Sequence, residues 1–156
     1  MRHSLLILSL VASSSALAEP PAAERPQPTA SQESIYRTLS VRDPVPGCET
    51  VEALSTTPVA DLLFVVEHAA QPPWAAMRAA QCLVRRHSAE IQPQIEGWVS
   101  AEETRGLAWM TLSFLDSMPI EVAMPVAQAA LAGPLRSEAR PRIQKAETPA
   151  LQDMAR

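Results

Sequence analysis

Apolar side chains recur at intervals of three and four residues in successive segments of this chain, and prolines separate the segments. This spacing places the apolar side chains on one face of an α-helix. In the first clear segment, Thr57 is a candidate N-cap, and Pro58 suits the first helical position because a proline there loses no helical hydrogen bond. Four glycines and three phenylalanine or tyrosine residues are too few for a β-sandwich or barrel. The sequence therefore predicts an all-α fold.

Five apolar stripes define the predicted helices. Pro73 begins the second of these helices, and Ser100 with Glu103 reads as a capping box that opens the fourth. Pro119 opens a further helix, which Pro125 is expected to kink. The predicted stripes are Val59, Leu62, Leu63 and Val66; Ala76, Ala80, Leu83 and Val84; Ile91, Ile95, Trp98 and Val99; Leu107, Met110, Phe114 and Met118; and Leu135, Ala139, Ile143 and Ala146.

The N-terminus has the pattern of a secretory signal peptide. Arg2 supplies a positive charge, an apolar run follows, and the small residues Ala16 and Ala18 form a cleavage site. The apolar run is shorter than the roughly 20 residues that span a bilayer. We therefore expect cleavage after Ala18, a periplasmic or secreted mature chain, and no membrane insertion of that chain.

Composition divides the rest of the chain into three parts. Residues 19–33 are rich in proline and poor in large apolar side chains, which predicts a disordered tether. Residues 34–147 are predicted to form the helical-repeat domain, beginning with a short helix over 33–39, and residues 148–156 a frayed tail. Loss of Arg2 with the signal peptide changes the formal net charge from −4 to −5. An acidic chain is a poor candidate for binding nucleic acid.

The predicted helices fall into pairs joined by short links. Ala80, Ala108 and Ala139 occupy comparable small-residue positions on the second helix of each pair, at steps of 28 and 31 residues. A period near 30 residues is typical of α-solenoids, in which each helix pair needs a neighbour to cover its apolar face.

Residues 74–83 (WAAMRAAQCL) and 104–112 (TRGLAWMTL) resemble the second helices of HEAT-like repeats. Pro125 matches the proline kink that is common in the first helices of such repeats. The resemblance spans about residues 58–146. It implies a short right-handed stack of antiparallel helix pairs, a HEAT-like α-solenoid, with a role in protein–protein interaction. An irregular helical bundle is the alternative that the residues leave open.

Cys48 and Cys82 are the only cysteines. An even number of cysteines in an exported chain favours a disulfide. Cys82 lies about 40° from Arg78 on a helical wheel, on a flank that would face a neighbouring segment. The alternative is two buried thiols.

Metal binding and nucleophilic catalysis find little support in the motifs. Cys82 and His87 are about 140° apart on one helix, whereas helical metal ligands are three or four residues apart. His68 has no ligand partner at such spacing. The sequence also lacks the Gly-x-Ser-x-Gly and Ser-x-x-Lys motifs of serine nucleophiles. We therefore expect no metal, no cofactor and no catalytic residue.

Two tryptophans lie outside the predicted apolar stripes. On a helical wheel, Trp74 shares a face with Arg78 and Arg85, and Trp109 shares one with Arg105. By the resemblance, both faces belong to second helices and line a concave surface. Because tryptophan and arginine dominate interface hot spots, these five residues form the candidate binding strip. The alternative is that stacking of neighbouring repeats buries these side chains.

Together these features predict an exported, non-catalytic helical-repeat protein that acts as a protein–protein interaction scaffold. Its expected partner is a protein or peptide. The alternative function is a small exported enzyme or metal-binding protein whose site assembles from scattered residues.

Overall fold

The computed structural model describes residues 26–156; the predicted signal peptide and the first part of the predicted tether lie outside them. Within this range the fold is all-α, as predicted, with α-helices and one 3-10 turn and no strand. No helix in this range is both long and apolar enough to cross a membrane. The elements are α1 (Ala30–Ser40), α2 (Cys48–Glu52), α3 (Pro58–His68), α4 (Pro73–His87), α5 (Gln92–Ser100), α6 (Arg105–Leu112), η1 (Leu115–Ser117), α7 (Ile120–Ala132), α8 (Arg136–Ile143) and α9 (Pro149–Met154).

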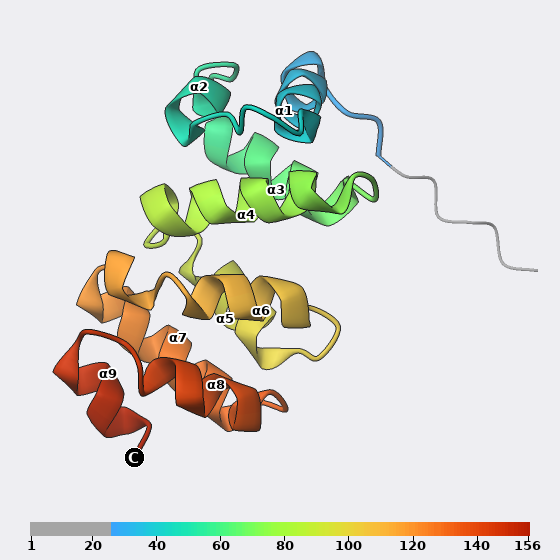
Figure 1. The fold of residues 1–156 in the computed structure, drawn as a ribbon. Coiled ribbons are helices and arrows are strands. Elements are labelled where there is room, and N and C mark those ends of the chain that lie inside the picture. Colours follow the sequence, from blue (N-terminus) through green and yellow to red (C-terminus); the bar gives the residue numbers. More distant parts are fainter. Residues whose placement is uncertain (1–25) are drawn as a thin grey trace, which may run out of the picture.

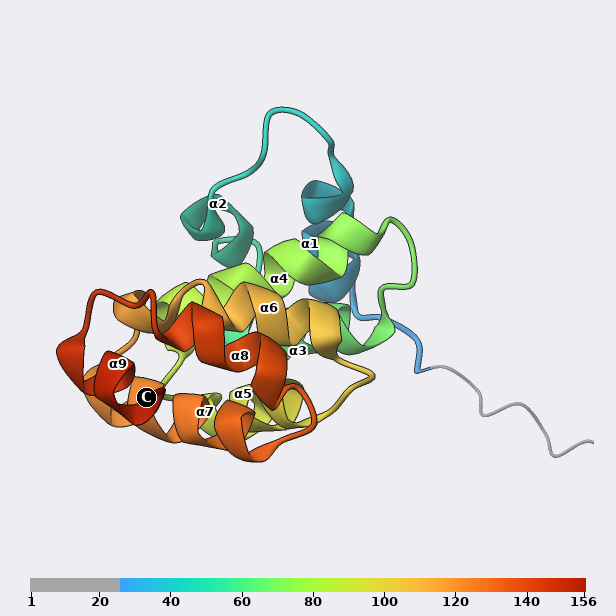
Figure 2. The ribbon, with the colours of Figure 1, turned by 60° about the horizontal axis from the view of Figure 1, so that its bottom comes forward.

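Consecutive helices pack in pairs, α3 with α4, α5 with α6 and α7 with α8. Helices α4, α6 and α8 lie side by side in one layer, and α5 packs against α7 behind them (Figure 2). Helices α1 and α2 cover one end of this arrangement, and α9 packs against α7 at the other end (Figure 1). The second helices of the three pairs, α4, α6 and α8, are therefore neighbours and share one surface of the molecule.

Small side chains let these helices approach closely. Ala80, Ala108 and Ala139, which the sequence aligned as comparable positions, are all fully buried. A larger side chain at such a site would force the neighbouring helices apart, because protein interiors are close-packed. The predicted stripe of α8 is also confirmed: Leu135, Ala139, Ile143 and Ala146 are buried.

The stripes predicted in α4 and α5 are buried at all positions but one each, whereas those of α6 and α3 are turned relative to the core. In α6 the buried residues are Ala108, Thr111 and Leu112, whereas Leu107, Met110 and Phe114 are only half-buried. The helix ends at Leu112 and a 3-10 turn follows, so the helical period does not continue through Phe114.

In α3 the rotation is similar. Leu62 and Val65 are buried together with Asp61, whose three hydrogen bonds turn this face of α3 inwards. The predicted positions Val59, Leu63 and Val66 are half-buried, as are Ala76 in α4 and Trp98 in α5.

The capping box predicted at Ser100 is wrong. Ser100 is the last residue of α5, and its hydroxyl donates to the carbonyl of Glu96 within the same helix. Helix α6 begins only at Arg105, so Glu103 lies in the turn before it. The hydroxyl of Thr104 closes this turn by donating to backbone carbonyls. A serine that donates to its own helix cannot cap the next one.

Both ends of the described chain are more ordered than predicted. Helix α1 begins at Ala30, inside the predicted tether, because Thr29 and Gln32 form a capping box. The predicted frayed tail contains α9, in which Leu151 and the following Ala155 are buried. At α3, Pro58 occupies the first turn as predicted, but Thr57 makes no side-chain capping bond.

Candidate functional site

The predicted disulfide is confirmed. Cys48, the first residue of α2, is bonded to Cys82 of α4, with Cα atoms 5.4 Å apart. Helix α2 has a single buried residue, Val51, so apolar packing contributes little to its position. The disulfide therefore fixes a short helix that could not hold its place by packing.

Two residues of the predicted binding strip bond to the chain's own backbone. The guanidinium of Arg78 donates to three carbonyls at the end of α1 and just after it, and the indole N–H of Trp74 donates to a fourth. These carbonyls belong to Leu39, Val41 and Arg42, and to Ser40, respectively. Arg78 and, in part, Trp74 thus hold the connection between α1 and α2.

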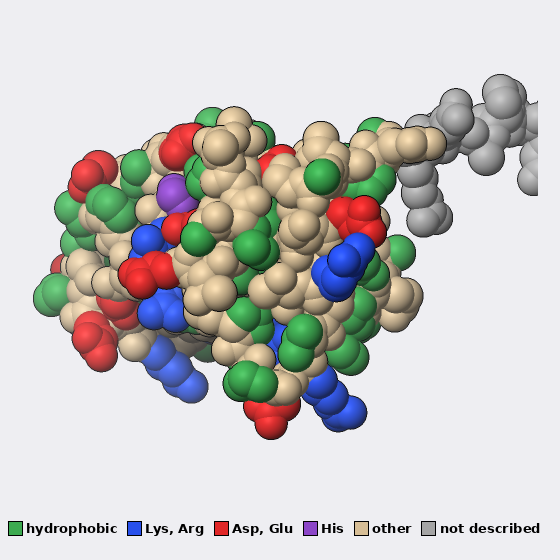
Figure 3. Space-filling view, turned by 90° about the horizontal axis from the view of Figure 1, so that it is seen from above, with side chains coloured by type: hydrophobic (Ala, Val, Ile, Leu, Met, Phe, Trp, Pro, Cys, Tyr) green, Lys and Arg blue, Asp and Glu red, His purple; other side chains and the backbone are tan. Residues whose placement is uncertain are grey.

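The last turn of α4 continues this attachment through charges. Arg86 Nε lies 3.0 Å from Glu52 Oε1, and His87 Nε2 lies 3.1 Å from the same oxygen. Arg86 also reaches Glu49 at 3.2 Å. Figure 3 shows the molecule from the side of α1 and α2. Acidic and basic side chains touch one another on this face, and hydrophobic side chains occupy other parts of it.

These attachments follow one line along α4. Trp74, Arg78, Cys82 and Arg86 are spaced by four residues, which places them on one face of the helix. All four side chains contact residues 40–52. We call this face the attachment stripe, and its bonds account for Trp74, Arg78 and Arg86 without an external partner.

Asp61 organises the same end of the molecule from within. Its carboxylate accepts hydrogen bonds from Ser31 at 2.6 Å, Ser55 at 2.6 Å and Gln32 at 3.0 Å, and the residue is 4% exposed. Burial alone would raise the pKa of Asp61, but these hydrogen bonds together outweigh burial and hold the pKa below its usual value. The sequence carried no signal for this role, since an aspartate on a helix is usually exposed.

Two further residues of the strip, Arg105 and Trp109, belong to α6. Trp109 is 42% exposed, and its indole N–H donates to Glu138 of α8 at 2.9 Å. The guanidinium of Arg142 lies 4.8 Å from the centre of the Trp109 ring. Arg105 pairs with Glu138 and, at 2.8 Å, with Glu102. We call Arg105, Trp109, Glu138 and Arg142 the tryptophan cluster.

Sequence reasoning found Trp109 and Arg105 but missed their partners on α8. Glu138 follows Trp109 by 29 residues, close to the step inferred between comparable positions of neighbouring pairs. Applying that step to the tryptophan would have indicated the cluster. Arg85 lies elsewhere, with its guanidinium 5.7 Å from the centre of the Phe114 ring. The five predicted residues therefore do not form one continuous strip.

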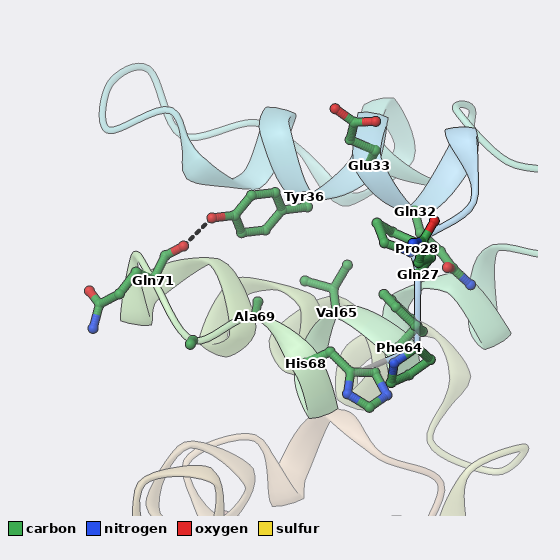
Figure 4. Close-up of a pocket in the computed structure, with 12 residues that line it drawn as sticks. Gln27, Pro28, Gln32, Glu33, Tyr36, Phe64, Val65, His68, Ala69 and Gln71 are labelled. Atoms are coloured by element: carbon green, nitrogen blue, oxygen red, sulfur yellow. Dashed lines mark hydrogen bonds between the residues drawn. The ribbon is translucent and has the colours of Figure 1, made fainter. Parts of the chain in front are cut away.

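A groove of about 610 Å³ lies between α1 and the end of α3. Val65 and Ala69 line its floor, with Tyr36 on one side and Phe64 and His68 on the other (Figure 4). The rings of Phe64 and His68 are 4.5 Å apart. Tyr36 donates a hydrogen bond to the backbone carbonyl of Gln71 at one end of the groove, and Pro28 lies at the opposite end (Figure 4).

The described residues contain no group of three or more histidine, cysteine, aspartate or glutamate side chains able to hold a metal ion. His68 stacks on Phe64, Cys82 is in the disulfide, and His87 pairs with Glu52. Comparisons of the chain with protein-family models, with curated proteins and with solved structures found no match. The tryptophan cluster and the groove are the two surfaces that geometry favours as binding sites.

Proposed function

We propose that this chain is an exported, non-catalytic helical-repeat protein that binds a protein or peptide partner through the tryptophan cluster. The proposal keeps the HEAT-like arrangement of helix pairs and a periplasmic or secreted location. The single observation that carries it is the state of Trp109, which is held in place and yet exposed.

The environment of Trp109 suits an interface anchor. Arg142 stacks on the ring and Glu138 accepts from its N–H, so two contacts hold the side chain in one orientation. An anchor that is ordered before binding loses less conformational entropy when the partner arrives. Tryptophan and arginine are also the residues that carry most binding energy in interfaces.

The arrangement of the second helices supports the same reading. Helices α4, α6 and α8 lie side by side, and contacts between neighbours join Trp109 to α8 and Arg85 to the end of α6. A layer of parallel-stacked second helices is the surface that repeat proteins use for extended binding. The Cys48–Cys82 disulfide fits an oxidising compartment.

Trp109→Ala tests the proposal. We expect the melting temperature to fall by less than about 5 °C, because an exposed ring and one cation–π contact contribute about 1 kcal/mol. Cross-linking in the native envelope should capture a partner with the wild-type chain, and the captured amount should fall about tenfold or more with the variant.

Ile120→Ala is the matched control, since Ile120 is 47% exposed on a different helix. It should leave capture unchanged. Equal loss of capture in both variants, or a melting temperature lowered by many degrees in Trp109→Ala, would contradict the proposal.

A further inference from the structure

The groove between α1 and α3 uses none of the residues of the tryptophan cluster, so it offers a second and separate surface. Its floor is the nearly buried Val65 together with Ala69, and three rings stand around it, those of Tyr36, Phe64 and His68. Aromatic-lined grooves of this kind bind extended proline-rich chains, whose rings pack flat against aromatic faces and whose polyproline conformation costs little entropy to order.

The chain already places prolines against this surface. Pro26 and Pro28, on either side of Gln27, form part of the lining. In Figure 4, Pro28 lies at the end of the groove near Phe64, and Tyr36 stands towards the other end. The groove therefore accommodates proline rings at one end, while the aromatic surface towards Gln71 is left for an external chain.

The charge of the groove adds a second preference. Among the residues that the structure describes, Glu33 is the single carboxylate of the lining, and no lysine or arginine lines the groove. Arg37 bonds Oε1 of Glu33 at 2.6 Å from outside the groove. Helix α3 ends at His68, so the partial negative charge of its C-terminus also lies at the groove. Because Arg37 already pairs with Glu33, a basic side chain of a ligand would take the place of Arg37, and the end of α3 favours that cation and disfavours an acidic ligand.

We propose that the groove between α1 and α3 binds an extended, proline-rich segment of a partner protein that also carries a basic side chain. The prolines pack against Tyr36, Phe64 and His68, and the basic side chain lies beside Glu33 and the end of α3. This function goes beyond the one proposed for the tryptophan cluster and does not depend on it.

Three synthetic peptides test the proposal against the folded full chain with its disulfide intact. The sequences are Pro-Pro-Arg-Pro-Pro-Arg-Pro, the same peptide with alanine in place of each proline, and the same peptide with glutamate in place of each arginine. Backbone NMR shifts should change around Tyr36, Phe64 and His68 with the first peptide, and binding of the other two should be at least several-fold weaker. Equal binding of the alanine peptide, no binding of the first peptide, or shifts confined to other helices would overturn the proposal.

Two variants locate the site. Phe64→Ala should weaken binding of the first peptide about tenfold, because an aromatic contact is lost. Glu33→Lys should weaken it about two- to fivefold, as expected for an exposed ion pair. Because Glu33 is exposed, this variant remains informative even if Phe64→Ala does not fold.

Glu121→Lys, an exposed charge reversal on α7, is the matched control and should bind as the wild type does. If Glu33→Lys and Glu121→Lys reduce binding equally, the effect reflects net charge alone and the proposed site is wrong.

Discussion

The segment from residue 40 to residue 52 and the helices α5 to α9 are held in place by different forces. The segment buries one side chain of α2, Val51, and depends on a disulfide, guanidinium–carbonyl bonds and ion pairs from α4. Helices α5 to α9 are instead lined by buried alanine, leucine, isoleucine and valine, as at Ile95 and Val126. Where a segment has little apolar surface to bury, covalent and polar bonds replace packing.

The same contrast separates two tryptophans that look alike in the sequence. The N–H of Trp74 donates to the backbone carbonyl of Ser40, within the attached segment. The N–H of Trp109 donates to the side chain of Glu138 on the neighbouring second helix. The first bond holds the chain's own loop, and the second orients a ring on an open face. Both rings remain partly exposed, 38% at Trp74 and 42% at Trp109, so the two tryptophans differ in what each N–H holds and not in exposure.

The largest expected effect comes from removing the disulfide. Cys48→Ala combined with Cys82→Ala should lower the free energy of unfolding by about 3–4 kcal/mol, because the crosslink closes a loop of about 35 residues in the unfolded chain. Urea unfolding of the double variant, and of the wild type with and without a reducing agent, measures this loss.

Amide hydrogen exchange of the double variant shows which helices lose stability when the disulfide is removed. We expect α2 to lose protection before α7, since α2 has little apolar packing to replace the bond. Earlier loss of protection in α7 would break the contrast between the two regions.

A smaller effect is expected at Asp61, the buried carboxylate of α3 that bonds Ser31 and Ser55. Asp61→Asn replaces one acceptor oxygen by a donor amide, so hydrogen bonds from Ser31, Ser55 or Gln32 are lost, at a cost of about 3 kcal/mol at neutral pH. The pKa of Asp61 is lowered in the folded chain, so its contribution is complete above its ordinary pKa of 3.8 and declines as pH falls through the folded value. Unfolding measured from pH 7 to pH 2 should therefore show the wild type and the variant converging in acid.

Asp116→Asn is the corresponding substitution among helices α5 to α9. Burial alone would raise the pKa of Asp116, but bonds from the backbone of Glu147, the hydroxyl of Thr148 and the backbone of Thr148 together lower it. Because Asp116 is exposed, we expect a loss of only about 1 kcal/mol, as for a helix cap. A loss larger than that of Asp61→Asn would reverse the comparison.

Two arginines extend the comparison, and the second of them has the smallest expected effect. Arg78→Ala removes three bonds from a guanidinium to backbone carbonyls and should cost about 2 kcal/mol. Arg142→Ala removes one stacking contact with Trp109 at the surface and should cost less than about 1 kcal/mol. Thermal unfolding of the two variants measures the difference, and equal costs would show that the attachment stripe and the tryptophan cluster do not differ in structural role.

Several features could be predicted because they depend on local spacing. The all-α class follows from helical periodicity and the scarcity of strand and turn formers, and the stripe of α8 was predicted correctly at Leu135, Ala139, Ile143 and Ala146. The wheel also placed Cys82 on a flank that faces another segment, where Cys48 lies. Prediction was wrong at Ser100, because the same Ser-x-x-Glu pattern occurs where a helix ends. Local spacing alone does not decide whether a Ser-x-x-Glu pattern begins a helix or ends one.

The candidate site was predictable only in part. Trp109 and Arg105 stood out because they do not fit an apolar stripe, but nothing near them in the sequence indicates Glu138 or Arg142, which come from the next helix pair. Arg78 and Trp74 also lie outside the predicted apolar stripe, but they bond to the chain's own backbone. The groove escaped prediction because its lining joins the end of α3 to α1 and the proline segment just before α1, which are distant from α3 in sequence.

The sequence by itself determined the helical class, because periodicity and proline positions act locally. It favoured the pairing of Cys48 with Cys82 because two cysteines allow a single bridge, but it left two buried thiols as the alternative, which the structure removed. Only the tertiary structure decided which polar residues serve the fold and which face outwards. Trp74 and Trp109 illustrate the reason: a helical wheel shows that a side chain leaves the core, but the packing of other segments decides its partner. The N–H of Trp74 bonds the backbone of the chain's own loop, and that of Trp109 bonds a side chain of the next helix pair.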